Sequence, residues 1–197
     1  MERKRFFNTR MIATTGILIT IEVILQVIGN YVVPGGFTSL NFSLIIISLG
    51  AILYGPVIGG FLGLISGIMT IFAPSTLSYF YSVSPIGTIL TCLLKTTVAG
   101  IVAGLVMLLF KKHNKNLAGY ITVSILVPTI NTGLFAIFCL VFFMNRLNEI
   151  NPNNIASALF LGMIGFNYIF EILTTSIITP SLIKIMEHIS INNREKY

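Results

Sequence analysis

The sequence predicts an all-α integral membrane protein, a bundle of six transmembrane helices with both chain ends in the cytoplasm. Hydrophobic residues make up 55% of the 197 residues and charged residues only 9%, and the mean hydropathy is +0.93. A small water-soluble domain cannot bury that much apolar surface. The apolar residues also gather in long runs, and about 20 helical residues cross a bilayer core. Residues 1–197 are therefore expected to form a single transmembrane domain.

The apolar runs cover about residues 11–30, 41–55, 56–74, 87–110, 117–144 and 157–186. The first follows the basic start MERKRFFNTRM without a convincing small-residue cleavage site, so we expect a retained helix rather than a removed signal peptide. The second is short and ends at Gly55 and Pro56, where a tight turn is expected because proline cannot continue a helix. Pro128 and Pro180, inside the fifth and sixth runs, favour kinks or local unwinding.

The basic residues indicate the orientation. Of the 12 Lys and Arg residues, Lys95 lies inside a run and Arg146 on one side of the membrane, which leaves ten for the chain ends and the segment 111–115 on the other side. Lys and Arg are enriched on the cytoplasmic side of membrane proteins. This distribution predicts cytoplasmic termini, and it accounts for the net charge of +6 without a nucleic acid partner.

Glycines recur at every fourth residue in two of the runs. Gly59, Gly63 and Gly67 do so in the third run, and Gly100 and Gly104 in the fourth. Small residues at this spacing let two helix backbones approach closely inside a membrane. We expect these glycines to serve helix packing.

Four polar residues inside the runs require an explanation because charged and amide groups are costly in a bilayer: Glu22, Lys95, Asn131 and Glu171, with Asn167 one turn from the last. A rise of about 1.5 Å per residue places Lys95 roughly 12 Å, Asn167 roughly 15 Å and Glu171 roughly 21 Å from the outer ends of their helices. Asn131 falls near the middle of its run. We expect Lys95, Asn131 and Asn167 to converge on one cavity in the outer half of the bundle.

Two acidic residues have open interpretations. Glu171 shares a helix face with Asn167, and it is either an ion-pair partner of Lys95 or an acceptor in the cavity. Glu22 and Gln26 are four residues apart on the first helix. We expect the Glu22 side chain to be hydrogen-bonded, either as a carboxylate or as a protonated acid.

Two uncharged segments, residues 33–40 and 74–86, are rich in Ser, Thr, Tyr and Gly. They fit either ordinary turns with interfacial tyrosines or a lid over an outward-facing pocket. On the second interpretation, the residues that close the first segment and wall the pocket are Thr38, Ser39, Asn41, Tyr79 and Tyr81.

The sequence lacks the side-chain sets of several enzyme classes. It contains no aspartate and no GxxxxGK[ST] phosphate loop, and no serine within the membrane has a histidine base. His113 and His188 have no acidic or cysteine neighbours at metal-ligand spacing. Cys92 and Cys139 lie in apolar runs, where we expect small buried hydrophobes rather than a disulfide. We therefore expect no enzyme activity, metal or cofactor.

The order of these features resembles a known family. The segments are NTRM leading into the first helix, LNFSLIIISLGAILYGPVIGGFLGLISG, SPIGTILTCLLKTTVAGIVAGLV, VPTINTGLFAIFCLVFF and GFNYIFEILTTSIITPSL. Over nearly the whole chain they resemble the substrate-binding S components of energy-coupling factor (ECF) transporters, in the vitamin-type branch. The resemblance implies six helices and an outward-facing vitamin pocket covered by the loop after the first helix.

The resemblance also implies partners and a transport cycle. The partners are a membrane coupling subunit and two cytosolic ATPases in a bacterial plasma membrane, and the S component topples in the membrane to release its vitamin inward. The family's first helix carries an AxxxA docking motif, and the matching positions here are Gly16 and Thr20, which are small but not alanine. The chain looks broadly like pantothenate-type members, whose small anionic substrate suits Lys95, Asn131 and Asn167; cobalamin-type members look similar.

Two other functions stay open on the sequence alone. A membrane assembly or structural protein would use the buried polar groups only to fasten helices together. A stand-alone secondary transporter usually has two matching halves with broken helices, which are not evident here.

Overall fold

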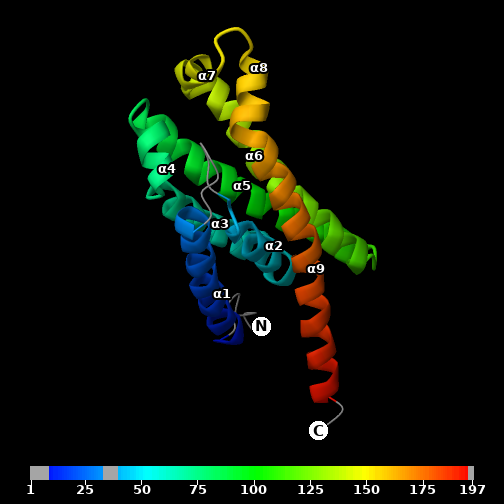
Figure 1. Ribbon diagram of the computed structural model, residues 1–197. Helices are drawn as coiled ribbons and strands as arrows, with labels where there is room; N and C mark the ends of the chain where they lie inside the picture. Colours follow the sequence, from blue (N-terminus) through cyan, green and yellow to red (C-terminus); the bar gives the residue numbers. More distant parts are fainter. Residues whose placement is uncertain (1–8, 33–39, 195–197) are drawn as a thin grey trace, which may run out of the picture.

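The computed structural model describes residues 9–32 and 40–194, and the described residues form helices and short connections without strands (Figure 1). The elements are α1 (Thr9–Val27), η1 (Ile28–Val32), α2 (Ser43–Tyr54), α3 (Pro56–Ile71), α4 (Pro74–Thr76), η2 (Leu77–Tyr81), α5 (Pro85–Lys112), α6 (Asn116–Phe142), α7 (Met144–Ile150), α8 (Ile155–Ser157), η3 (Ala158–Ile164) and α9 (Gly165–Arg194), where η marks a π-helical segment. The all-helical fold class is as the sequence predicts.

Four helical segments are long and apolar enough to cross a membrane: Met11–Asn30, Pro85–Lys112, Asn116–Phe142 and Gly165–His188. A fifth candidate is bent, because α3 and the segment Pro74–Tyr81 meet at an angle of 62°. The remaining apolar helix, α2, has only 12 residues, about 18 Å of helix against a hydrocarbon core of about 30 Å. The described chain is thus a multi-pass membrane protein with four or five candidate spans, where the sequence predicted six.

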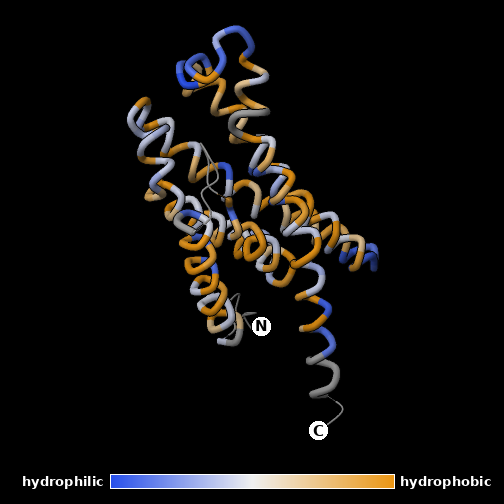
Figure 2. Tube along the Cα trace, in the orientation of Figure 1, coloured by the Kyte–Doolittle hydropathy of each residue, from blue (hydrophilic) through white to orange (hydrophobic). Residues whose placement is uncertain are grey.

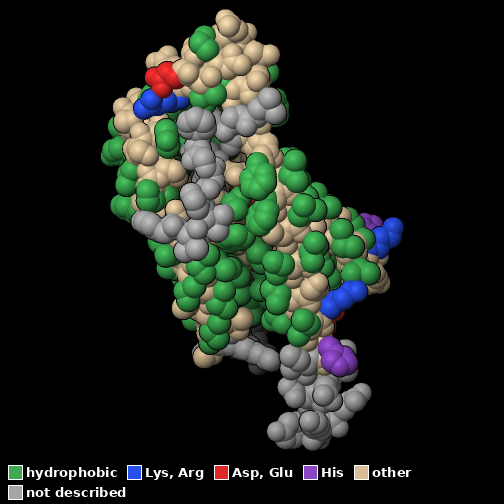
Figure 3. Space-filling view, in the orientation of Figure 1, with side chains coloured by type: hydrophobic (Ala, Val, Ile, Leu, Met, Phe, Trp, Pro, Cys, Tyr) green, Lys and Arg blue, Asp and Glu red, His purple; other side chains and the backbone are tan. Residues whose placement is uncertain are grey.

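The hydrophobic surface fits this environment. On α1, the side chains of Ile12, Ile17 and Ile24 are exposed, whereas Glu22 and Gln26 on the opposite face are buried. Figure 3 shows hydrophobic side chains over most of the visible middle of the molecule, with charged side chains toward its ends. The same division appears along the chain, where hydrophilic residues concentrate at the connection from α7 to α8 and at the turn from α5 to α6 (Figure 2).

Helices α3 and α5 are in backbone contact through the predicted glycines. A Cβ atom on Gly100 would lie 2.1 Å from the Gly59 carbonyl oxygen, and one on Gly63 would lie 2.2 Å from the Thr96 carbonyl oxygen. Gly67 and Gly104 are equally restricted, by Cys92 and Pro56. Any side chain at these positions would push the helices apart, so the predicted role in packing is confirmed.

Helix α2 is the most enclosed part of the molecule, since Ser43 to Ile52 are all buried. The tight turn predicted after it is confirmed: Gly55 has φ 85°, and Pro56 occupies the first turn of α3. At the same place, the Lys111 ammonium donates a hydrogen bond of 2.7 Å to the carbonyl oxygen of Ile52. This bond satisfies one of the carbonyl groups that a helix end leaves without a partner.

Residues 74–86 differ from the predicted loop, because Pro74–Tyr81 is helical. Arg146 holds this segment to α7: its guanidinium donates to the Tyr79 carbonyl oxygen (2.9 Å) and the Ser82 hydroxyl (3.1 Å) and pairs with Glu149. The predicted last span also starts differently, with α8 and η3 before α9. Helices α6 and α9 continue through Pro128 and Pro180.

Beneath Arg146 lies a second apolar cluster, which is separate from the core around α2. The Phe80 ring packs edge-on against Phe143 (5.1 Å between centroids) and Phe135 (5.8 Å). The other buried members of the cluster are Cys139, Leu147, Ala158, Leu159 and Ile164. It forms one wall of the cavity described next.

Candidate functional site

A partly open pocket lies between the helices, with ≈ 680 Å³ of empty space including its mouth. Segments from α1 to α9 contribute to it. Its walls are formed by Gln26, Asn41, Thr70, Ser75, Thr76, Phe80, Thr88, Thr91, Cys92, Lys95, Asn131, Thr132, Phe135, Phe143, Ile164, Asn167, Tyr168 and Glu171. Polar groups are thus gathered in the interior of a chain that is otherwise strongly apolar.

One face of α5 supplies the cation of the pocket. The residues of this face recur at a spacing of three or four along the helix, so their side chains point the same way. They are Thr88, Thr91, Cys92 and Lys95. The Lys95 ammonium lies 5.1 Å from the centroid of the Phe135 ring on α6. An aromatic face attracts a cation without neutralising it. Lys95 is therefore held at the pocket wall by a contact that supplies no opposite charge.

Glu171 on α9 brings a carboxylate to the same pocket, and it is buried. Its Oε1 accepts a hydrogen bond of 3.2 Å from the backbone N–H of Asn41, and the Thr132 side chain also hydrogen-bonds the carboxylate. Within residues 9–32 and 40–194, the ion pair that the structure contains joins Arg146 and Glu149. Lys95 and Glu171 act on each other electrostatically without forming the direct pair that was one of the two sequence interpretations.

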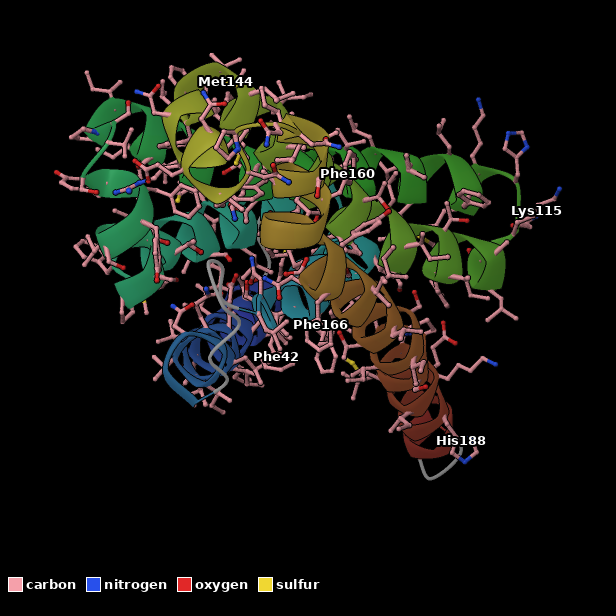
Figure 4. All side chains as sticks on the ribbon, turned by 45° about the horizontal axis from the view of Figure 1, so that its top comes forward. Phe42, Lys115, Met144, Phe160, Phe166 and His188 are labelled. Atoms are coloured by element: carbon pink, nitrogen blue, oxygen red, sulfur yellow. The ribbon has the colours of Figure 1, made fainter. Side chains whose placement is uncertain are left out.

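Aromatic contacts fix Glu171 beside Asn41. Phe42, at the start of α2, packs edge-on against Phe170 with 5.9 Å between centroids, and Phe170 stacks on Phe166 at 6.2 Å. Figure 4 shows Phe42 and Phe166 on the bundle, whereas Lys115 and His188 lie far out at the α5–α6 turn and near the end of α9. Because Phe42 and Phe170 are the sequence neighbours of Asn41 and Glu171, their packing holds the two polar residues in reach of each other.

Hydrogen bonds connect the start of α2 with α1. The Ser43 hydroxyl donates to the Asn41 side-chain oxygen (2.5 Å) and shares a 2.5 Å contact with the Ser66 hydroxyl. One turn along α3, Thr70 accepts a bond of 3.2 Å from the Gln26 side-chain amide of α1. Because the Thr70 hydroxyl also donates to the Ser66 carbonyl oxygen (2.8 Å), these bonds link the pocket residues Gln26, Thr70 and Asn41 across α1, α3 and the start of α2.

Three amide atoms of the pocket walls are buried without a hydrogen-bond partner among the described residues. They are the Oε1 of Gln26, the Nδ2 of Asn41 and the Oδ1 of Asn131. Buried polar atoms in folded proteins nearly always have a partner. These atoms accordingly have capacity for water or for a bound molecule.

The structure brings together five of the predicted site residues: Lys95, Asn131, Asn167, Glu171 and Asn41 all line the pocket. Thr38 and Ser39 lie outside the described residues. Tyr79 and Tyr81 are each 39% exposed and are not part of the pocket wall. Phe80, between them, is buried and lines the pocket instead, because the helical turn directs it inward.

Several wall residues were missed from the sequence. Thr88 and Thr91 share the face of α5 that carries Lys95, and this spacing could have identified them. Gln26 could have been found as the next buried polar position after Glu22 on α1. Phe135 and Tyr168 carry no signal that separates them from lipid-facing aromatics.

The two remaining predictions concern α1. Gly16 and Thr20 lie on its exposed face, where no atom comes within 4 Å of a Cβ built on Gly16. Glu22 is fully buried, and in the part of the chain that the structure describes, neither carboxylate oxygen has the hydrogen bond that the sequence predicted. Glu22 does not line the pocket.

Fold and site together define a class: a multi-pass helical membrane protein that encloses a polar pocket with a cation and a carboxylate among its helices. Comparison with protein families makes this class specific. The family model for the ECF transporter substrate-specific component matches residues 10–183. The chain belongs to this family, which provides the substrate-binding subunits of ECF importers, working with ECF membrane and ATPase modules, and is not an enzyme family. A comparison with curated proteins gave no match.

Proposed function

We propose that this chain captures a water-soluble vitamin outside a bacterial cell, with pantothenate as its substrate, and delivers it inward as part of an ATP-driven importer. The observation that carries the proposal is Lys95, a cation that faces the pocket over the Phe135 ring with no ion-pair partner among the described residues. A charge at this depth is costly unless a partner or ligand offsets it. An anionic substrate would supply that partner.

The neutral polar groups favour pantothenate among vitamin anions. Pantothenate carries one carboxylate, two hydroxyls and an amide. The pocket offers Lys95 for the carboxylate, and the side chains of Asn131 and Asn167 for hydrogen bonds to the rest of the molecule. Apolar surface from Phe80 and Phe143 would cover the substrate's methyl groups. In this proposal the described residues bind and orient the substrate, and the ATPases of the complex provide the energy.

The proposed topology has six crossings, both termini in the cytoplasm and one substrate-binding domain over residues 1–197. The short α2 would count as a crossing because it is buried among longer helices rather than facing lipid. The coupling subunit would dock on the exposed face of α1 at Gly16 and Thr20, where a partner helix could approach closely. The Thr20 hydroxyl already bonds the Gly16 carbonyl oxygen (3.0 Å), which leaves little polar surface to desolvate there.

A ligand screen on the purified full-length chain tests this function. Native mass spectrometry and thermal unfolding would be run against a panel of water-soluble vitamins. A ligand that binds only the folded state raises its apparent stability. Nanomolar binding of pantothenate supports both the class and the substrate, whereas cobalamin binding keeps the class and overturns the role of Lys95. If no vitamin of the panel binds or raises the unfolding temperature, the result favours a membrane assembly protein.

A further inference from the structure

The pocket holds opposite charges that are kept apart. Lys95 lies over the ring of Phe135, and Glu171 is held by the backbone of Asn41 and by Thr132. Inside a membrane, opposite charges usually meet as a direct pair. Because each group here is placed by other neighbours, a ligand can contact the cation with one end and the carboxylate with another.

The unpartnered amide atoms indicate which kind of hydrogen-bonding group a ligand should carry at the end away from Lys95. Gln26 and Asn131 line the pocket and each has a buried side-chain oxygen without a partner among the described residues, and Glu171 brings a carboxylate to the same wall. Acceptors of this kind are matched by hydroxyl, amide or amine hydrogens, and a ligand without such hydrogens would leave them buried and unpaired. Among the described residues that line the pocket, Lys95 is the one lysine, and neither arginine nor histidine accompanies it.

We propose that the substrate is a small molecule with one anionic group bound at Lys95 and a separate end of hydroxyl, amide or amine donors bound by Glu171, Gln26 and Asn131. The inference rests on the proposed function and states which chemical groups the substrate must carry and which residues meet them. It makes Glu171 an acceptor for the ligand rather than an ion-pair partner of Lys95. It also makes Gln26, on α1, a specificity-determining residue.

The separate placement of the two charged groups distinguishes between vitamin classes. A ligand with a single anion and hydrogen-bond donors at its other end can meet the Lys95 ammonium and the Glu171 carboxylate individually. A cationic ligand would leave Lys95 unpaired, and an uncharged ligand would leave the Lys95 charge without an anion. A site built for specific hydrogen bonds rejects analogues that lack them by large factors.

Three probes separate the two halves of the inference in the full-length chain. Pantothenate has both the anion and the donors, pantothenol replaces the carboxylate by a neutral alcohol, and nicotinate has a carboxylate without hydroxyl or amine donors. Isothermal titration should show pantothenate binding at least about tenfold more tightly than either of the others. Equal affinity for pantothenol overturns the anion site, and equal affinity for nicotinate overturns the donor site.

The failure of the inference is distinguishable from that of the proposed function. Binding of cationic thiamine or uncharged riboflavin in preference to pantothenate would keep a vitamin-binding subunit and overturn the inference. The absence of binding by every vitamin would overturn both.

Variants assign the ends of the ligand to residues. Lys95→Met should weaken pantothenate by about 10- to 100-fold and leave pantothenol unchanged, because only the first has the charge that Lys95 meets. Gln26→Leu and Glu171→Gln should weaken both ligands by similar factors. Ser181→Ala, an exposed position on the same helix as Glu171, is the matched control and should change neither. A Lys95→Met protein that loses both ligands equally would reduce Lys95 to a structural role.

Discussion

Helix α5 has two faces that differ in kind. One face meets α3 through Gly100 and Thr96, with backbone against backbone and no room for a side chain. The other face presents Thr88, Thr91 and Lys95 to a pocket whose walls keep unpartnered polar atoms. The residues of the first face are closely packed against α3, and those of the second line a pocket that has room for a ligand. One helix thus packs tightly against α3 through one set of residues and lines the pocket through another, and Cys92 belongs to both.

Packing on the α3 side supplies the stability that the pocket side lacks. Inside a bilayer there is no hydrophobic force to hold helices together, so close backbone contact must do so. Unpaired buried groups in the pocket work against folding. Substitutions on the first face should therefore act on stability, and substitutions on the second should act on ligand affinity.

The largest expected effect is on the packed face. Gly100→Ala places a Cβ atom 2.1 Å from the Gly59 carbonyl oxygen and 2.5 Å from its carbon. Since neither backbone can yield without separating α3 from α5, we expect the free energy of unfolding to fall by about 3 kcal/mol, the upper end of the usual cost of overpacking. Thermal unfolding in detergent and size-exclusion chromatography would measure it. Gly133→Ala on α6, with no atom within 4 Å of its Cβ, is the control; equal stability of the two variants would contradict the packing argument.

The second effect is on binding rather than folding. Lys95→Ala should weaken pantothenate by about 100-fold, the effect of removing a charge-assisted contact, while the unfolding temperature of the unliganded chain stays within a few degrees. Lys112→Ala, an exposed lysine on the same helix, should leave affinity unchanged. Unchanged affinity in a folded Lys95→Ala protein would remove Lys95 from the site.

A smaller effect is expected at the edge of the pocket. Arg146 ties the segment Leu77–Tyr81 to α7, and Phe80 of that segment lines the pocket. Because Arg146 is partly exposed, Arg146→Ala should cost only about 1 kcal/mol or less. Hydrogen exchange should nonetheless become faster in residues 77–84, and bound pantothenate should dissociate faster. Unchanged exchange there would show that the aromatic cluster alone holds the segment.

The sequence predicts the packed face better than the pocket face, for a physical reason. Glycine spacing on α3 and α5 has one structural use in a membrane, so Gly59 and Gly100 could be placed from their positions alone. Helical depth likewise indicated that Lys95, Asn131 and Asn167 lie near one another, and the structure puts all three in one pocket wall.

What the sequence missed depends on how helices turn and bend. The uncharged composition of residues 74–86 suggested that Tyr79 and Tyr81 wall the pocket, but the helical turn there directs Phe80 inward. Glu171 kept two interpretations because its depth along the helix does not tell which way its side chain points around the helix axis. In the structure Asn41, 130 residues away in sequence, donates a hydrogen bond to it. Such contacts follow from tertiary packing and have no local signal.

The last expected effect, similar in size to that of Arg146→Ala, tests whether the two regions are independent. The Tyr120 hydroxyl on α6 donates a hydrogen bond of 2.6 Å to the Glu187 carboxylate on α9, at the end of these helices away from the pocket. Tyr120→Phe removes this bond and should cost about 1 kcal/mol, a shift of about 2–4 °C in the unfolding midpoint. Tyr54→Phe is the control, because no described residue hydrogen-bonds its hydroxyl. If Tyr120→Phe also weakened pantothenate, α6 and α9 would transmit strain from that end to Asn131 and Glu171, and stability and affinity could no longer be assigned to separate faces.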